Sequence, residues 1–211
     1  MLEPGILLLI LSYLLGSIPS AVWIGKLFFD TDIRDYGSGN AGATNTFRVL
    51  GRNAGIPVLV IDACKGWLAA MLPLWFLVGS DAPVLFENFR VLCGAAAVIG
   101  HIFPVFAGFR GGKGIATLLG VSIGMQPVAA LCCIGFFILV LLLTHYVSLG
   151  SILASLFYAS FILLIERAHH DATIIFAVTI PFLVIVTHVK NIRRLLKGNE
   201  SRTYLINKRN Q

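Results

Sequence analysis

The segment from Tyr36 to Asn45, YGSGNAGATN, combines three glycines with short side chains that carry hydrogen-bond donors. Glycines let the backbone turn so that several N–H groups converge on one anion. The segment also contains the GxGxxG pattern, but the strand that must precede it in a dinucleotide-binding fold is missing, because DTDIRDY is polar. We therefore expect a phosphate-binding loop without a nucleotide, although an ordinary flexible loop fits the composition equally well. The candidate ligands are Ser38, Gly39, Asn40, Thr44 and Asn45.

A second glycine cluster, FRGGKG at Phe109–Gly114, places a lysine directly before an apolar segment. It fails as a P-loop, because Ala107 stands where the first glycine belongs and Gly114 replaces the Ser or Thr. A helix that starts here would still offer free N–H groups and the positive end of its dipole. Gly111, Gly112 and Lys113 are therefore candidate phosphate ligands, and the alternative interpretation is a tight basic turn that marks topology.

The third candidate group is HVKNIRR at His188–Arg194, followed by Glu200. In a helix, His188 and Asn191 would share one face, because they are three residues apart. Arg193 adds a cation beside them. A lone histidine near a membrane surface is more often an anchor than a catalyst, so this pattern gains weight only together with the other two.

Two charged residues, Asp62 and Lys65, lie three positions apart within an apolar segment. Charges inside a membrane are costly unless they are paired or hydrated, and they usually mark function. We interpret this pair as a structural support beneath the loops.

The elements that must position these residues are membrane-spanning helices. The chain has 211 residues, 57% of them hydrophobic and 12% charged, with a mean hydropathy of +0.88, whereas soluble domains carry about 25% charged residues. This composition predicts an all-α membrane protein, a helical bundle formed by one domain over residues 1–211. Seven segments could span the bilayer, and the fourth is short enough that six spans are an alternative. They are Ile6–Phe28, Ile56–Gly79, Val91–Phe106, Gly114–Gly124, Val128–Thr144, Val147–Ile165 and Thr173–His188.

The basic residues predict the orientation of the bundle. If seven spans alternate, one side holds twelve Lys and Arg residues and the other holds only Arg90 and Arg167. The positive-inside rule makes the first side cytoplasmic, with the N-terminus outside and the C-terminus inside. The first segment lacks a basic start, so we expect a retained span and not a signal peptide. The twelve are Arg34, Arg48, Arg52, Arg110, Lys113, Lys190, Arg193, Arg194, Lys197, Arg202, Lys208 and Arg209.

Other chemistries find little support. The net charge of +6 is explained by topology or by an anionic substrate, so we expect no nucleic-acid partner. Cys64, Cys93, Cys132 and Cys133 lie in apolar stretches without zinc spacing, so we expect buried residues, no disulfide and no metal site. Three donor-rich loops on one face, above a hydrophobic bundle, fit an enzyme that joins a phosphorylated molecule to a lipid. A transporter or binding protein for such a molecule is the alternative, although its site should lie near the bilayer midplane.

Together these motifs identify a resemblance that extends over nearly the whole chain. The sequence resembles the bacterial acyl-phosphate-dependent glycerol-3-phosphate 1-acyltransferases, the PlsY family. The resemblance rests on GSIP at Gly16–Pro19, SGNAGATN at Ser38–Asn45, Asp62 with Lys65 and Gly66, GHIFPVFAGFRGGKGIAT at Gly100–Thr117, and HVKNIRRLLKGNE at His188–Glu200.

The resemblance implies an inner-membrane enzyme with seven spans, its active site facing the cytoplasm and short or broken helices near the active-site loops. It would transfer an acyl group from acyl phosphate to the sn-1 hydroxyl of glycerol 3-phosphate, giving lysophosphatidic acid. No cofactor is implied, and a soluble acyl-phosphate synthase would supply the donor. As a hypothesis, the Ser38–Asn40 and Gly111–Lys113 segments hold acyl phosphate. Arg48, His188 and Asn191 would hold glycerol 3-phosphate, and Glu200 would orient a basic group. The general base would be His188 or the donor's own phosphate.

Overall fold

A computed structural model describes residues 2–76 and 83–203, and every regular element within these ranges is helical. The chain forms two compact units, Met1–Pro127 and Val128–Gln211. The first contains α1 Leu2–Gly16, α2 Ser20–Phe29, η1 Ile33–Asp35, α3 Ala43–Leu50, α4 Arg52–Phe76, α5 Pro83–Ile102, η2 Val105–Ala107 and α6 Ile115–Met125. The second contains α7 Pro127–Thr144, α8 Val147–Ser160, η3 Phe161–Ile165, α9 Asp171–Thr187 and α10 Val189–Leu196. The predicted span end at Gly79, and Lys208 and Arg209, lie outside the described residues.

Five described segments are long and apolar enough to cross a membrane, and a sixth is possible if α9 and α10, which meet at a 63° bend, form one span. They support the prediction of a multi-spanning helical protein. The predicted fourth span corresponds to α6, whose 11 residues extend only about 16 Å against a hydrocarbon core of about 30 Å. The seven-span count therefore stays a prediction. The five are Gly5–Phe29, Arg52–Phe76, Leu85–Ala107, Pro127–Thr144 and Val147–Ile165.

The first predicted span is not one continuous helix. It breaks between α1 and α2 at Ser17–Pro19, because Pro19 has no N–H to continue the helical ladder. The break exposes the carbonyl of Ile18, which accepts a 2.9 Å hydrogen bond from Nζ of Lys65 on α4. A broken helix thus lies beside the candidate site, as the sequence predicted.

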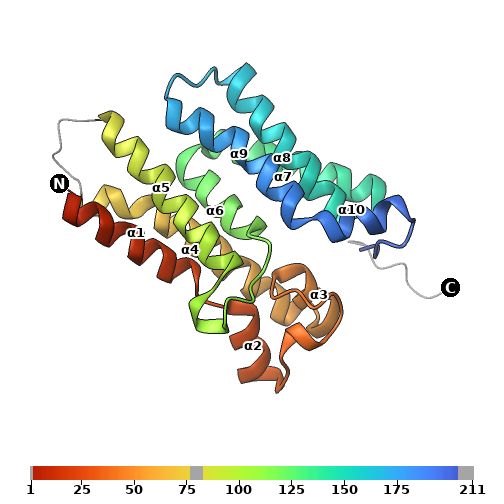
Figure 1. Ribbon diagram of the computed structural model, residues 1–211. Coiled ribbons are helices and arrows are strands. Elements are labelled where there is room, and N and C mark those ends of the chain that lie inside the picture. The colour runs from red at the N-terminus through yellow and green to blue at the C-terminus, as the bar shows by residue number, and fades with distance from the viewer. Residues whose placement is uncertain (1, 77–82, 204–211) are drawn as a thin grey trace. The chain divides into compact units, whose positions relative to one another are not determined.

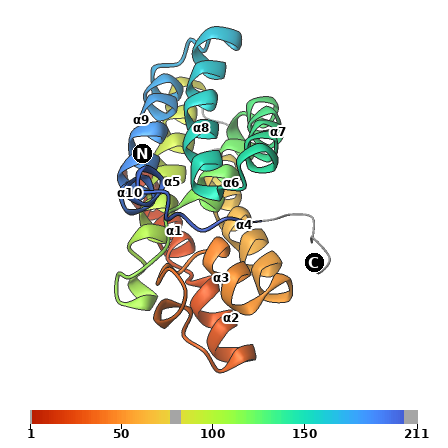
Figure 2. The same ribbon diagram turned by 90° about the vertical axis from the view of Figure 1, so that its right-hand side faces the viewer.

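In the first unit, α1, α4, α5 and α6 pack side by side, and α2 and α3 lie at one end of them (Figures 1 and 2). Small residues allow this close packing. A Cβ added to Gly66 of α4 would lie 2.1 Å from the Thr117 carbonyl oxygen, and one added to Gly120 of α6 would lie 1.8 Å from the Ala63 carbonyl oxygen. These contacts fix α6, and with it the loop that precedes α6.

Arg90 does not lie in a loop, where the topology prediction placed it, but within α5. Its side chain pairs with Glu87 at 3.0 Å and donates to the carbonyl of Gly124, near the end of α6. The last carbonyls of a helix need such a donor when they are buried. Arg90 therefore caps the short helix α6.

In the second unit, α8 packs against α9, and a π-helical turn at Phe161–Ile165 ends α8. The rings of Phe136 on α7 and Phe157 on α8 stack with their centroids 4.7 Å apart. His188 forms the junction at which α9 passes into α10. The unit therefore presents the third motif at a helix bend.

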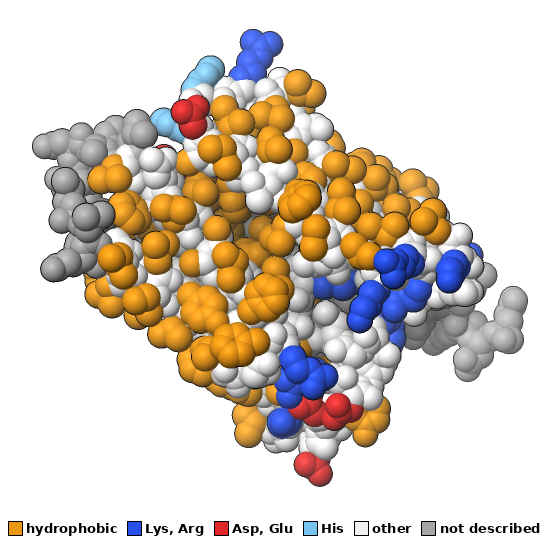
Figure 3. All heavy atoms as spheres, in the orientation of Figure 1, with side chains coloured by type: hydrophobic (Ala, Val, Ile, Leu, Met, Phe, Trp, Pro, Cys, Tyr) orange, Lys and Arg blue, Asp and Glu red, His pale blue; other side chains and the backbone are white. Residues whose placement is uncertain are grey.

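Hydrophobic side chains cover most of the visible helical surface, with Lys and Arg gathered in small clusters (Figure 3). This is the pattern of helices that face lipid. Of the cysteines, Cys93 and Cys133 are buried as predicted, whereas Cys64 and Cys132 are exposed and correct that prediction. All four are free thiols.

Candidate active site

The first glycine-rich loop is held in shape by Asn45. Its buried side chain accepts a 2.8 Å hydrogen bond from the Ser38 amide and donates to the carbonyls of Ile33 and Tyr36, each at 3.0 Å. Gly37 has a φ of +61°, and a Cβ there would lie 2.4 Å from the Asn45 side-chain oxygen. Asn45 was predicted as a phosphate ligand, but its amide group is engaged in closing the loop.

The remaining loop candidates face outward. Ser38, Gly39, Thr44 and Arg48 are exposed, and Asn40 is half-buried. Gly39 also has a positive φ, +71°, which favours glycine at that position. The helix α3 starts at Ala43 and places Thr44 in its first turn and Arg48 in its last. The loop therefore presents hydroxyl, amide and guanidinium donors on one rigid frame.

The second loop folds back onto the end of α5. The amide of Gly111 donates to the Ile102 carbonyl at 3.2 Å, and that of Gly112 to the His101 carbonyl at 3.1 Å. A Cβ on Gly111 would lie 2.0 Å from the His101 carbonyl oxygen, and one on Gly112 would lie 2.2 Å from Nε2 of His101. These two glycines therefore allow close packing on His101, and their N–H groups are engaged within the protein.

Lys113 follows this packed turn and is half-buried. The next residue, Gly114, has a φ of +79° and precedes α6 with no side-chain cap on the helix. A helix start of this kind attracts anions. The second loop thus offers the Lys113 side chain and the first turn of α6 to a ligand, and not the amides of its two glycines.

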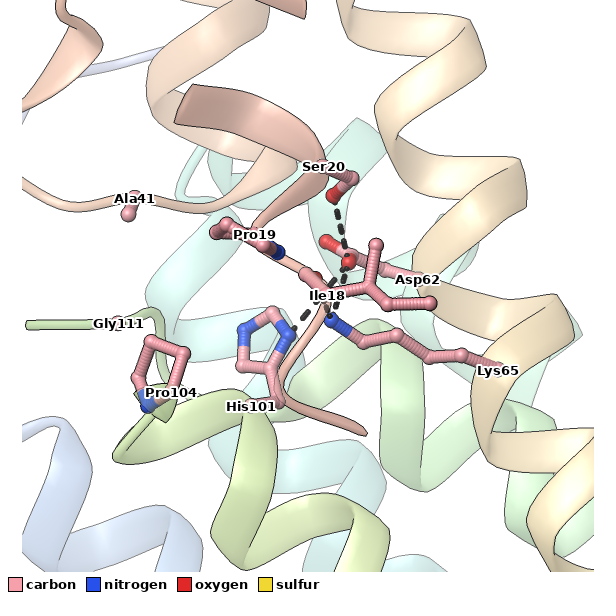
Figure 4. Close-up of a pocket in the computed structure, with 9 residues that line it drawn as sticks. All are labelled: Ile18, Pro19, Ser20, Ala41, Asp62, Lys65, His101, Pro104 and Gly111. Atoms are coloured by element: carbon pink, nitrogen blue, oxygen red, sulfur yellow. Dashed lines mark hydrogen bonds and ion pairs between the residues drawn. The ribbon is translucent and has the colours of Figure 1, made fainter. Parts of the chain in front are cut away.

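Beneath the two loops lies a small pocket that contains a buried charge cluster (Figure 4). One carboxylate oxygen of Asp62, Oδ1, is 2.7 Å from Ser20 Oγ, 2.8 Å from Lys65 Nζ and 3.5 Å from His101 Nδ1. The lining also includes Ala41 of the first loop and Gly111 of the second. Through these contacts, Asp62 and Lys65 lie between the helix break at Ile18 and His101 beneath the second loop.

The sequence pattern gave no role to His101, although this residue lies within the GHIFPVFAGFRGGKGIAT motif. It is buried, with Nδ1 toward Asp62 and Nε2 against Gly112. Three buried partners converge on Oδ1 of Asp62, while Oδ2 has no hydrogen-bond partner among the described residues. His101 lies ten residues before the Gly111–Gly112 pair, so it reaches the pair only because the intervening chain turns back.

In the second unit, His188 lies at the α9–α10 bend and is buried. Its Nδ1 is 2.8 Å from the Val184 carbonyl oxygen. A carbonyl oxygen only accepts, so Nδ1 carries the proton and Nε2 holds the lone pair when the ring is neutral. This is the tautomer that a general base acting through Nε2 requires.

Glu200 organises the rest of the third motif. Its Oε1 accepts hydrogen bonds from Asn191 at 2.6 Å and Ser148 at 2.9 Å, and its Oε2 pairs with Arg194 at 2.7 Å. Burial raises the pKa of Glu200, but the donors from Asn191, Arg194 and Ser148 outweigh it and leave the pKa below its ordinary value. Glu200 thus pairs with the basic side chain of Arg194, whereas Arg193 is exposed.

The structure brings the first two motifs together in the first unit and builds the third motif in the second. Among the described residues, no group of three or more His, Cys, Asp or Glu side chains could hold a metal ion. The chain is therefore a multi-spanning helical protein with two loops that carry hydrogen-bond donors and a separate group formed by His188, Asn191 and Glu200. This combination is that of a membrane protein whose loops carry hydrogen-bond donors and cations suited to an anion.

Comparison with known proteins identifies the family. Residues 6–198 match the family model of glycerol-3-phosphate acyltransferase. Proteins named glycerol-3-phosphate acyltransferase are similar to this chain in Staphylococcus saprophyticus, with 45% identity over 92% of this chain and 96% of the relative, and in Listeria monocytogenes, with 46% identity over 92% and 94%. The chain belongs to the glycerol-3-phosphate acyltransferase family and is an acyltransferase enzyme of the membrane.

Two solved structures show the same fold. A crystal structure of PlsY, an integral membrane glycerol 3-phosphate acyltransferase, in its glycerol 3-phosphate form matches with a TM-score of 0.84 at 38% identity, over 95% of this chain and 96% of that chain. Its lysophosphatidic acid form matches with a TM-score of 0.80 at 37% identity, over 95% and 96%. The all-helical integral membrane fold predicted from the sequence is thereby confirmed.

Proposed function

We propose that this enzyme transfers a fatty acyl group from acyl phosphate to the sn-1 hydroxyl of glycerol 3-phosphate, releasing lysophosphatidic acid and phosphate. The observation that carries the proposal is the pairing of two donor loops in one unit. Arg34 of the first-loop region donates to the Ala107 carbonyl ahead of the second loop at 2.9 Å, so both loops lie at the same end of the bundle. The crystal structures of PlsY in its glycerol 3-phosphate form and its lysophosphatidic acid form support glycerol 3-phosphate as the acceptor and lysophosphatidic acid as the product.

Acyl phosphate is a mixed anhydride, so the enzyme has no need for a covalent intermediate. It must hold two anions together, orient the hydroxyl and stabilise the oxyanion that forms on the acyl carbon. The Ser38–Asn40 loop, Thr44 and Lys113 would hold the phosphate of the donor. Because the amides of Gly111 and Gly112 are already bonded, the second loop would act through Lys113 and the first turn of α6.

Arg48 of the first unit and His188, Asn191 and Arg193 of the second are the candidate ligands of glycerol 3-phosphate. Its hydroxyl oxygen attacks the acyl carbon, the bond between that carbon and the phosphate oxygen breaks, and phosphate leaves with both electrons. The hydroxyl proton goes to Nε2 of His188 or to an oxygen of the leaving phosphate. Glu200 would keep Asn191 and Arg194 in place.

We further propose seven spans, with the donor loops and the tail on the cytoplasmic side of a bacterial inner membrane. The basic residues of the two loops and of α10 support this orientation. A soluble acyl-phosphate synthase would deliver its amphipathic product, an anionic phosphate on an apolar acyl chain, to this face. The bilayer would accommodate the acyl chains of donor and product beside the apolar helices.

The proposal is tested with purified protein, acyl phosphate and glycerol 3-phosphate. We expect lysophosphatidic acid and inorganic phosphate in equal amounts. Lys113→Met should reduce turnover at least about 100-fold, as expected when an electrostatic contact to the reacting phosphate is lost, whereas Lys197→Met at an exposed position should leave it unchanged. Near-native turnover by Lys113→Met would exclude the assigned phosphate site. Flux of glycerol 3-phosphate into liposomes without product would favour the transporter.

A further inference from the structure

Arg34 connects the two donor loops, although the sequence pattern gave it no role beyond topology. It lies in η1, directly before the first glycine-rich loop, and its side chain is only 16% exposed. Its Nη1 donates to the Ala107 carbonyl across 73 residues of sequence at 2.9 Å. This is a direct side-chain bond between the segments that carry Ser38 and Lys113.

The guanidinium is held rigidly on its own side. Its Nε and Nη2 donate to the two carboxylate oxygens of Asp32 at 2.9 Å and 2.7 Å. The hydrogen bond from Arg34 is the main reason that the pKa of Asp32 lies well below its usual range, so the carboxylate stays ionised. A two-point contact between arginine and carboxylate fixes the plane of the fork, which a lysine cannot reproduce. The remaining nitrogen of the guanidinium group, Nη1, is thereby directed at the carbonyl of Ala107.

The acceptor side is an equally constrained turn. Ala107 ends η2, and Gly108 and Phe109 after it have φ values of +63° and +59°. The Ala107 carbonyl also accepts from the Arg110 amide at 3.4 Å. A non-glycine residue with positive φ persists when surrounding contacts impose it. Ala107, to which Arg34 donates, precedes Lys113 by six residues.

The backbone at Ile33 and Arg34 also lies against the first loop. Its carbonyl oxygen would be 3.4 Å from a Cβ on Gly39, and the carbonyl of the preceding Ile33 accepts from Asn45. The Ile33–Arg34 segment is therefore bonded to the first loop through the Ile33 carbonyl and to the base of the second loop through the Arg34 side chain. Such a residue can set the distance between two donor groups without touching a substrate.

We propose that Arg34 is a positioning residue that holds the Ser38 loop and the Lys113 loop at the spacing needed to contact one phosphate group from both sides. The inference rests on the proposed function, because it supplies the reason for a fixed spacing. Asp32 contributes to this positioning by fixing the orientation of the Arg34 guanidinium group. Without the bond to Ala107, each loop keeps its own internal hydrogen bonds, but the two loops are no longer held at the distance at which both contact the same phosphate group.

The test compares Arg34→Gln and Arg34→Lys with a matched control, Lys26→Gln. Lys26 pairs with the same carboxylate, at 3.2 Å from Asp32, but its side chain is 56% exposed and the described contacts give it no bond to the second loop. We expect Arg34→Gln to lower kcat/KM for acyl phosphate about 10- to 100-fold, mainly through KM, the size expected for a charge-assisted hydrogen bond. The kcat/KM of Arg34→Lys should lie between the values of the wild type and Arg34→Gln. The kcat/KM of Lys26→Gln should equal that of the wild type.

A double-substitution cycle separates positioning from stability. If Arg34 aligns the loops, Ser38→Ala should cost clearly less in the Arg34→Gln background than in the wild type, because the two loops no longer act on one phosphate. An unchanged KM with a lower active fraction, or an equal cost of Ser38→Ala in both backgrounds, would overturn the inference. If Arg34→Gln does not fold, the same comparison is made with Arg34→Lys. A wild-type protein without product would refute the proposed function itself, whatever the Arg34 variants do.

Discussion

Gly111 and Gly112 illustrate how one residue type serves two physical purposes. Glycines before a lysine suggest a phosphate cradle, but the amides of these two residues bond to the end of α5, and their Cα atoms pack on His101. His101 in turn faces Asp62. The second loop therefore depends on a buried imidazole as its floor, and Lys113 receives its position from this packing.

The packing of Gly112 gives a direct prediction. Gly112→Ala places a methyl group 2.2 Å from Nε2 of His101, so the imidazole or the loop must move. We expect kcat/KM to fall at least about 10-fold, because overpacking a buried site costs about 1–3 kcal/mol of free energy. Gly135→Ala is the control, because a Cβ there meets no atom within 4 Å, and it should keep native activity. Native kinetics for Gly112→Ala would contradict the role of His101 as the loop's floor.

His188 is tested by the pH dependence of turnover. With Nδ1 bonded to the Val184 carbonyl, the neutral ring carries its lone pair on Nε2, and protonation at low pH removes that base. If His188 is the base, the wild type should lose activity on the acid side, and His188→Ala should lose most activity together with that acid limb. Substantial remaining activity with an unchanged profile would assign the proton to the leaving phosphate.

At this scale the sequence predicted which residues carry donors but not which ones are already engaged. Ser38 and Asn45 belong to the same motif, yet Ser38 is exposed while the Asn45 side chain bonds to three backbone groups. Residue type sets donor capacity, whereas engagement depends on the path of the chain. Arg34 and His101 were overlooked for the same reason, since their partners lie far away in sequence or on another helix.

At the scale of elements, the sequence located the apolar segments but not all of their breaks. The first span was predicted to run from Ile6 to Phe28, whereas the structure breaks it before Pro19, between α1 and α2. The short α6 was recognised from its length, but the donor to its buried end, Arg90, was assigned to a loop because charge was taken as the end of a span. Long-range capping of this kind has no local pattern in the sequence.

The docking of the tail onto α8 and α10 gives the prediction for this scale. The pKa of Glu200 is depressed in the folded protein, so its contribution to stability is present above the ordinary pKa of a glutamate and is lost as the pH falls through the lower, folded value. Docking should therefore persist from pH 8 to about pH 5. Glu200→Gln should raise amide hydrogen exchange of residues 198–203 about 10-fold, which is the size of one lost charge-assisted bond. Glu166→Gln serves as control, and equal exchange in both variants would refute the docking role.

At the scale of the whole molecule, the central prediction is topology. Single cysteines at Asp35, Arg110 and Ser201, introduced after Cys64, Cys93, Cys132 and Cys133 are replaced by serine, mark the first loop, the second loop and the tail. With seven spans, an impermeant maleimide should label all three from the cytoplasmic side only. Six spans would place Ser201 on the opposite side from Asp35, and labelling of that kind would reject the proposed orientation.

The choice of acyl donor tests the whole account most directly. The two loops carry hydrogen-bond donors for a small phosphate, and the GxGxxG pattern in the first lacks the strand that a dinucleotide-binding fold requires. These features favour acyl phosphate over acyl-CoA as the acyl donor. Purified protein should form lysophosphatidic acid from glycerol 3-phosphate and acyl phosphate, and at least about 100-fold less from acyl-CoA at equal concentration, the discrimination expected when a site lacks its donor's phosphate contact. Equal or faster turnover with acyl-CoA would contradict the account.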